Sequence, residues 1–76
     1  MKIIGVLLGE YEGNKYAKCI FTERLTRGGS VGDNAIISKA SYQVGLDIAS
    51  DWSSYENKNV SVFYDRFGRV QGVELV

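Results

Sequence analysis

Hydrophobic and polar residues alternate along most of this chain, and short groups of Gly, Asn, Asp and Ser interrupt the alternation. The alternating windows are rich in Val, Ile, Phe, Tyr and Thr, the residues that favour a pleated, half-buried surface. This pattern predicts five strands, over about Lys2 to Glu10, Lys15 to Leu25, Ala35 to Ala40, Asn59 to Asp65 and Val70 to Val76.

The turns between these strands must be made without proline, which the chain lacks. Glu12-Gly13-Asn14 separates two apolar runs and predicts a tight hairpin turn. The stretch from Thr26 to Asn34 holds three glycines and predicts a flexible loop. Arg66-Phe67-Gly68-Arg69 separates the last two strands and predicts a second hairpin.

The segment from 41 to 55 fits two structures. Its apolar residues alternate as in a strand, whereas Val44, Ile48 and Trp52 form the stripe of a helix. Asp47 and Asp51 are poor strand formers, so we predict a short helix over about Val44 to Trp52. Because Trp52 and Tyr55 continue the apolar stripe, we expect them to pack in or over the core.

Three strands, a helix and a two-strand hairpin form the element order of the OB-fold. We therefore predict a mostly β protein, a small five-stranded OB-like barrel with one short helix between strands 3 and 4. With 76 residues, the chain is expected to form a single domain over 1–76.

Composition narrows the expected environment and partners. Nine Lys and Arg balance nine Asp and Glu, which argues against a strongly electrostatic binder but allows charges segregated by face. No segment approaches the roughly 20 apolar residues of a membrane span, and the apolar start is too short for a signal peptide. We expect a soluble cytoplasmic protein, with the lone Cys19 buried and reduced.

The residue inventory disfavours catalysis. The chain has no histidine and one cysteine, so neither a Cys/His zinc site nor a Ser-His or Cys-His nucleophile pair can form within it. The glycine-rich stretch from Gly28 to Gly32 lacks the Gly-Lys-Ser/Thr of a P-loop. No spacing singles out a pair of carboxylates. We predict a protein that is not an enzyme and uses neither a metal nor a cofactor.

The second strand is the most informative element. Ala17, Cys19 and Phe21 fall on one face and form a good core set. The other face interleaves Tyr16, Lys18, Ile20, Thr22 and Arg24, a mixture that suits single-stranded nucleic acid, where bases stack on rings and cations hold phosphates. An ordinary solvent-facing side of a strand is the alternative interpretation.

The late hairpin and the long loop add candidates. Two arginines bracket Phe67 at an expected loop tip, and Phe63 could join an outer aromatic surface on strand 4. Arg24 and Arg27 stand at the start of the glycine-rich loop. The predicted nucleic-acid-binding residues are Tyr16, Lys18, Arg24, Arg27, Phe63, Arg66, Phe67 and Arg69.

The chain resembles the small OB-fold single-stranded-DNA-binding proteins of filamentous phages and of Gram-positive mobile elements. The resemblance rests on the short length, on the turn in Glu12-Gly13-Asn14-Lys15-Tyr16, and on the stretch from Val60 to Val70. It implies a homodimer that coats single-stranded DNA cooperatively and without sequence preference. Tyr16, Lys18, Arg66, Phe67 and Arg69 are the matched positions.

A second class of function fits the neutral charge and the scattered acidic residues. In this alternative the chain is a protein-interaction or regulatory adaptor domain that does not bind nucleic acid. Binding to an oligonucleotide, or its absence at low salt, separates the two hypotheses.

Overall fold

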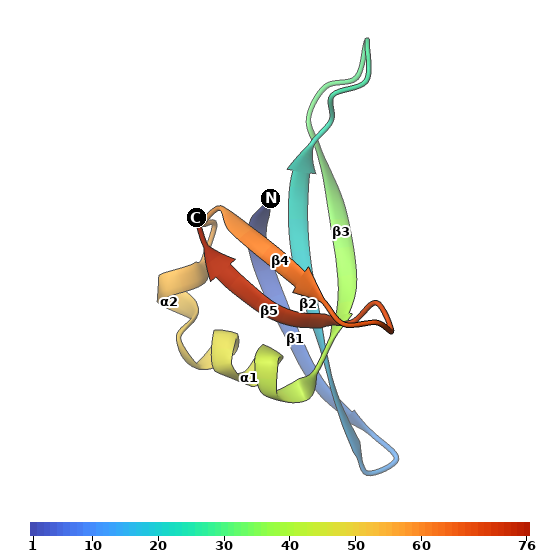
Figure 1. Ribbon diagram of the computed structural model, residues 1–76, viewed down its shortest axis with the longest axis vertical. Coiled ribbons are helices and arrows are strands. Elements are labelled where there is room, and N and C mark those ends of the chain that lie inside the picture. The colour runs from blue at the N-terminus through green and yellow to red at the C-terminus, as the bar shows by residue number, and fades with distance from the viewer.

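The computed structural model describes residues 1–76 as one five-stranded mixed sheet with two short helices (Figure 1). The prediction of a mostly β chain with a short helix after the third strand is confirmed. The strands are β1 (Lys2–Tyr11), β2 (Asn14–Arg24), β3 (Asp33–Ala40), β4 (Val60–Tyr64) and β5 (Val70–Leu75), and the helices are α1 (Tyr42–Ser50) and α2 (Trp52–Tyr55).

The strand order in the sheet is β1-β2-β3-β5-β4. Neighbouring strands are antiparallel except β3 and β5, which run parallel and share the single pair Ala40–Val70. β1 meets the start of β4 through one bridge, between Lys2 and Asn59, next to a 2.8 Å hydrogen bond from the Val60 amide to the Met1 carbonyl. The sheet is not closed into a barrel, because β1 and β4 share only this contact.

Period-two alternation places one face of β2 in the core, as the sequence predicts. Ala17 is 2% exposed, and Cys19 and Phe21 are fully buried. Burial in apolar surroundings raises the pKa of the Cys19 thiol, because desolvation disfavours the thiolate. Half-buried Trp52 and Tyr55 pack against this core, which also confirms their predicted role. The buried apolar cluster is Ile3, Ala17, Cys19, Phe21, Ala40, Ile48, Val60 and Val70.

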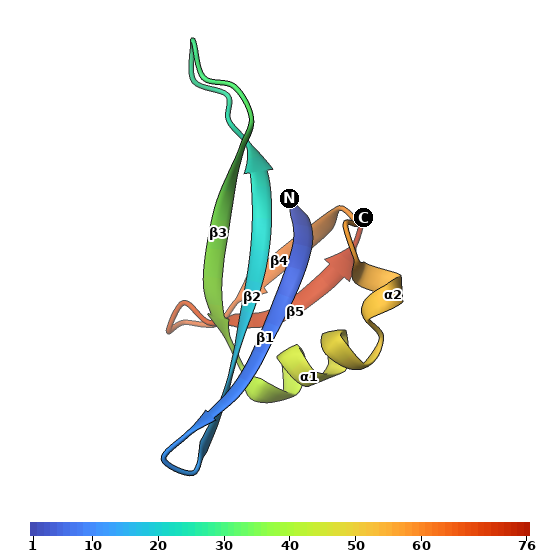
Figure 2. The ribbon, with the colours of Figure 1, turned by 180° about the vertical axis from the view of Figure 1, so that it is seen from behind.

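Two hairpins lengthen the molecule to 45 × 25 × 20 Å and project at opposite ends (Figures 1 and 2). The β1–β2 hairpin turns through Glu12 and Gly13, which have φ values of 51° and 79° and lie between the paired residues Tyr11 and Asn14. Positive φ at both central residues is the mark of a type I′ turn, whose twist matches that of the strands. The predicted tight turn is therefore confirmed, and the β2–β3 hairpin carries the predicted glycine-rich loop at the other end.

Ser41 sets the beginning of α1. Its Oγ accepts a 3.3 Å hydrogen bond from the Val44 amide, which satisfies one of the free donors at the helix N-terminus. The helix therefore starts at Tyr42, two residues before the predicted Val44, and ends at Ser50. Asp51 separates it from α2. Neither helix has the length and apolar character needed to cross a membrane.

Gly45 determines how closely α1 approaches the sheet. It is buried on the helix face that contacts β2, and a Cβ at this position would lie 2.5 Å from the Cβ of Ala17. Real side chains do not approach that closely, so the absence of a side chain lets the helix rest on β2. Glycine disfavours an isolated helix, but at position 45 it allows the helix to pack on the sheet.

Gly45→Ala should destabilise the protein by about 1–3 kcal/mol, because the added methyl group overpacks the contact with Ala17. In an exposed helix the same change stabilises the helix by up to about 1 kcal/mol. The sign of the change in unfolding free energy therefore distinguishes a packed position from an exposed one. Urea unfolding monitored by circular dichroism measures the effect. Gly28→Ala is the matched control, because a Cβ at Gly28 would have no other atom within 4 Å. A Gly45→Ala variant as stable as the parent would contradict the close approach.

Candidate nucleic-acid interface

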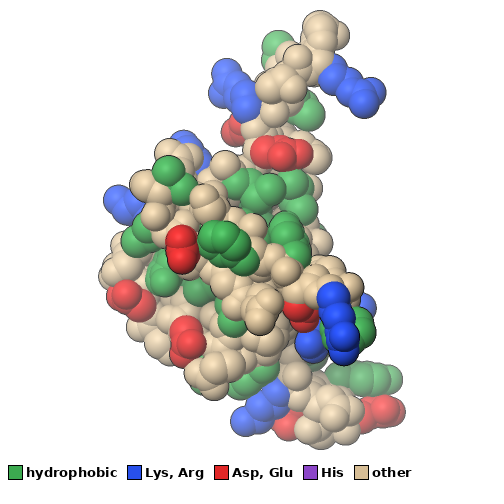
Figure 3. Space-filling model, in the orientation of Figure 1, with side chains coloured by type: hydrophobic (Ala, Val, Ile, Leu, Met, Phe, Trp, Pro, Cys, Tyr) green, Lys and Arg blue, Asp and Glu red, His purple; other side chains and the backbone are tan.

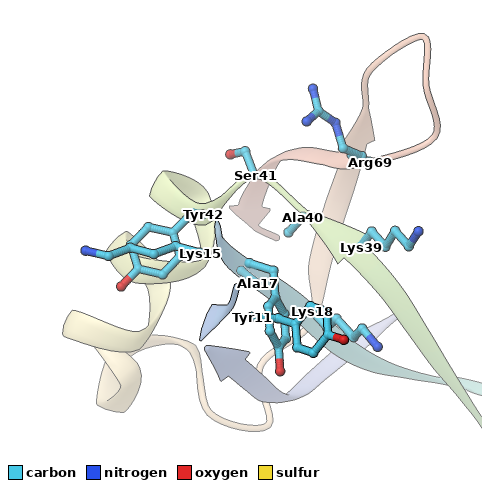
Figure 4. Close-up of a pocket in the computed structure, with 10 residues that line it drawn as sticks. Tyr11, Lys15, Ala17, Lys18, Lys39, Ala40, Ser41, Tyr42 and Arg69 are labelled. Carbon is cyan, nitrogen blue, oxygen red and sulfur yellow. The ribbon is translucent and has the colours of Figure 1, made fainter. Parts of the chain in front are cut away.

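A groove of about 540 Å³ opens where β3 leaves the sheet and α1 begins (Figure 4). The end of β1, the start of β2, the end of β3, the start of α1 and the end of the β4–β5 loop all contribute to it. None of its lining residues is acidic. They are Tyr11, Lys15, Tyr16, Ala17, Lys18, Lys39, Ala40, Ser41, Tyr42 and Arg69.

Four of the nine basic residues of the chain line this groove. Lys18 and Lys39 are directly opposite each other on β2 and β3, in the register that pairs Ala17 with Ala40. Like charges at such positions repel and lower the stability of a sheet. Lys15, near the start of β2, and Arg69, at the end of the β4–β5 loop, also line the groove. The arrangement leaves an excess of positive charge that an anionic ligand would neutralise.

Tyrosines form the apolar part of the groove. The ring of Tyr16 lies over Gly9, its partner on β1, where any Cβ would overlap the ring. Gly9 therefore lets the ring lie close against the strand while 39% of Tyr16 stays exposed. Tyr11 is 71% exposed at the end of β1. Tyr42, on the helix side, has the Lys15 ammonium 5.4 Å from its ring centroid.

One carboxylate organises the β4–β5 loop beside the groove. The Oδ1 atom of Asp65 accepts hydrogen bonds from the amides of Phe67 and Arg69, both at 2.9 Å. Its Oδ2 atom accepts another, also at 2.9 Å, from the Arg69 Nε. The hydrogen bond from the Arg69 amide lowers the pKa of Asp65 most. Desolvation opposes this shift, and the bonds from the Arg69 side chain and the Phe67 amide, with the arginine charge, lower the pKa further.

Phe67 stands at the tip of this loop between two arginines. It is 70% exposed, with the guanidinium carbons of Arg66 and Arg69 4.9 and 5.8 Å from its ring centroid. Both distances are within the range of cation–π attraction. Asp65 holds Arg69, and Arg69 in turn links the loop tip to the groove that it lines. The exposed ring is thus held by its neighbours, without being folded onto the core.

The structure brings together five of the eight residues predicted from the sequence. Tyr16, Lys18 and Arg69 line the groove, and Arg66 and Phe67 lie on the adjacent loop. The other three lie elsewhere.

Arg24 and Arg27 belong to the β2–β3 hairpin, at the end of the molecule opposite the β1–β2 hairpin (Figure 1). The Nη1 atom of Arg24 is 4.0 Å from the Oδ1 atom of Asp33, which lies opposite Arg24 on β3. Phe63 is 49% exposed on β4, where it packs over Gly72, and it does not line the groove. Arg24 is far from the groove because β2 is a long strand and the groove lies at its other end. Phe63 is outside the groove because β4 is at the edge of the sheet.

Four groove residues were missed by reasoning from the sequence: Tyr11, Lys15, Lys39 and Tyr42. Lys39 becomes a neighbour of Lys18 only through the β2–β3 register. Tyr42 reaches the groove because the Ser41 cap starts the helix at that point. The sequence does show basic and aromatic residues at the ends of the predicted strands. No local pattern, however, predicts that segments so far apart along the chain come together.

The helical segment is acidic. The segment from 40 to 57, which contains both helices, carries Asp47, Asp51 and Glu56 and no basic residue. Figure 3 shows acidic side chains over the helices on the left, and at lower right it shows Lys and Arg side chains together with further acidic ones. In a chain of zero net charge, the helical segment is therefore a negative region, whereas charges of both signs surround the groove.

Comparison of the chain with models of protein families, with curated proteins and with solved structures found no match.

The Asp65 carboxyl should titrate with a midpoint below the ordinary value of about 3.9. A lowered native pKa means that the stability contributed by Asp65 is present above the unfolded-state pKa and is lost as pH falls through the native one. Asp65→Asn should therefore destabilise the protein at neutral pH, with the difference from the parent shrinking in strong acid. NMR titration of the carboxyl carbon and thermal unfolding across pH measure both effects. Glu74→Gln, which removes an exposed charge from β5, is the matched control. An unshifted Asp65 midpoint would argue against the loop geometry.

Proposed function

We propose that this chain binds single-stranded nucleic acid, without catalysing a reaction, through the groove and the adjoining β4–β5 loop. One observation supports the proposal: four cations and three tyrosines line a groove that no carboxylate lines. A polynucleotide has phosphates and flat bases at regular intervals, and it therefore needs both kinds of contact along one surface.

The cations would hold the phosphates. Lys18 and Lys39 repel each other in the free protein, and a phosphate between them relieves that repulsion while releasing counterions from the nucleic acid. Arg69 presents a planar guanidinium, which suits a phosphate better than a point charge does. Binding of this kind does not depend on base sequence, in agreement with the sequence-independent coating that the resemblance implies.

The aromatic rings would stack on the bases. The Tyr16 ring lies against Gly9 while 39% of the residue stays exposed, so part of the ring is available for stacking. Phe67 is exposed at a loop tip, where the neighbouring guanidinium groups lie against its ring. Base–aromatic stacking tolerates every base and contributes about 1–3 kcal/mol per base. The proposed ligand is therefore an unpaired strand, because bases in a duplex are already stacked on one another.

The architecture supports an OB-like interpretation of the same surface. The strand order, the helix between β3 and β4, and the bridge from Lys2 on β1 to Asn59 just before β4 are features expected of a partly open OB barrel. OB-folds bind polynucleotides on the face of strands 2 and 3 and through the loops that join strands 1 to 2 and 4 to 5. The groove lies among these same elements. DNA and a homodimeric assembly enter the proposal from the resemblance.

Fluorescence polarisation of a labelled oligothymidine across a salt series tests the proposal. Binding should be measurable at low salt and weaken as salt rises. Lys18→Gln and Lys39→Gln should each weaken binding and lower the slope of log affinity against log salt by about 0.7, the value for one phosphate contact on a single strand. Lys58→Gln removes the same charge outside the groove and should leave the slope unchanged. No binding at low salt would sink the proposal and favour a protein-interaction domain.

Phe67→Ala should weaken oligonucleotide binding by about 1–3 kcal/mol, which corresponds to about 5- to 150-fold in affinity. The loss follows from removal of a stacking ring, so Phe67→Tyr should retain most of the affinity. Because Phe67 is 70% exposed, neither change should alter thermal stability appreciably. Equal losses for the alanine and tyrosine variants would show that the ring does not stack on a base.

A further inference from the structure

We propose that the open edge of β1 binds an extended peptide segment of a partner protein, in which basic residues alternate with apolar ones. The segment adds a strand beside residues 6 to 10 and places an apolar side chain between β1 and the helices. The residues of this surface do not line the groove, and its test uses no nucleic acid. Failure of this inference and failure of the proposed function are therefore distinguishable.

β1 lies at the edge of the sheet, and only its beginning is paired on the outer side. The Ile3 amide donates to the Lys58 carbonyl at 3.2 Å, and the Ile3 carbonyl accepts from the Asn57 amide at 3.0 Å. The irregularity between Ile3 and Gly5 follows this contact. From residue 5 to residue 11, β1 pairs with β2 alone. An unpaired edge of this kind can accept another strand.

The hairpin turn establishes which backbone groups are on the open side of β1. Tyr11 and Asn14 flank a type I′ turn and therefore form a hydrogen-bonded pair. Bonded and non-bonded pairs alternate along an antiparallel ladder, so the odd-numbered residues of β1 from 5 to 11 bond to β2. The amides and carbonyls of Val6, Leu8 and Glu10 therefore point away from β2, where a peptide strand can bind them.

An apolar pocket of about 410 Å³ lies beside this edge, and we call it the edge pocket. Figures 1 and 2 show that α1 extends sideways past β1 toward α2. A strand added to β1 passes over this side of the helices, and alternate side chains of that strand point toward them. The pocket can therefore take an apolar side chain of the peptide. Its lining residues are Ile4, Gly5 and Val6 of β1, Ala49 of α1 and Trp52 of α2.

Charge selects a basic segment as the occupant. The segment from 40 to 57, which supplies the helical wall of the edge pocket, carries three acids and no basic residue. One of these acids, Asp51, directly precedes Trp52. Lys2 and Lys58 lie at the beginning of β1, where its edge is already paired. Lysine or arginine residues that alternate with apolar ones are attracted to the acidic wall while the apolar side chains are buried.

The same charges disfavour other occupants of this surface. A polyanion is repelled by the acids of the helical segment. A second copy of the chain, paired edge to edge through β1, brings two acidic helical segments toward each other, and like charges across an interface weaken binding. A basic and apolar peptide is the occupant that satisfies the unpaired backbone, the apolar pocket and the acidic wall together.

Trp52 reports on the edge pocket directly, because it lines the pocket and is the only tryptophan of the chain. The probe is the synthetic peptide Lys-Val-Lys-Leu-Lys-Val-Lys, blocked at both ends. Its titration should shift the Trp52 emission to the blue and reach saturation. The control peptide, with Glu in place of each Lys, should bind at least tenfold more weakly. No shift with the basic peptide, equal binding of the acidic one, or a shift on raising the protein concentration alone would overturn the proposal.

Two further measurements separate strand pairing from charge attraction. N-methylation of alternate peptide residues removes every second amide. Methylating the set that faces β1 should weaken binding by about tenfold, and methylating the other set should have little effect. Asp51→Asn keeps the oxygen that accepts from Ser54 but removes the charge, so it should weaken binding by about two- to fivefold. Glu23→Gln, near the far end of β2, is the matched control and should bind as the parent does. Equal effects of the two methylated sets, or of the two protein variants, would refute this mode of binding.

Discussion

The strand β2 is anchored in the core by three buried side chains, Ala17, Cys19 and Phe21. Their burial determines which side chains of β2 lie on its outer face. A fully buried Phe side chain alone contributes about 1.5–3 kcal/mol. Sliding β2 by one residue would expose all three side chains and bury Lys18, so the register is strongly specified. Because the side-chain period is two, the same burial forces Tyr16 and Lys18 outward.

The groove depends on glycines as much as on charged residues. Gly45 allows α1 to rest on Ala17 and so brings Tyr42 to the groove edge. Gly9 leaves room for the Tyr16 ring. Larger side chains at either position would move the aromatic rings that the proposed function uses. The packing of α1 on the inner face of the sheet and the position of the Tyr16 ring on its outer face thus depend on the same short stretch of β1 and β2.

Charge placement explains how a chain of zero net charge would bind a polyanion. Acidic residues without basic partners lie along the helical segment, and the groove collects four cations. Asp65, an acid beside the groove, is used internally, because its oxygens hold the loop amides and Arg69. At distances below the Debye length of about 10 Å, a ligand is attracted by the charges nearest to it. The net charge of the whole chain matters less.

The sequence by itself determined the five strands, the turn at Glu12 and Gly13, the buried face of β2 and the exposed Arg66-Phe67-Gly68-Arg69 loop, because alternation and turn chemistry are local properties. It also placed a helix near Val44, although the Ser41 cap moved its start. Only the tertiary structure decided that Lys39 and Tyr42 join Tyr16 while Arg24 and Arg27 lie at the far end. Register and strand order bring distant segments together, and these depend on packing across the whole sheet, which no local pattern records.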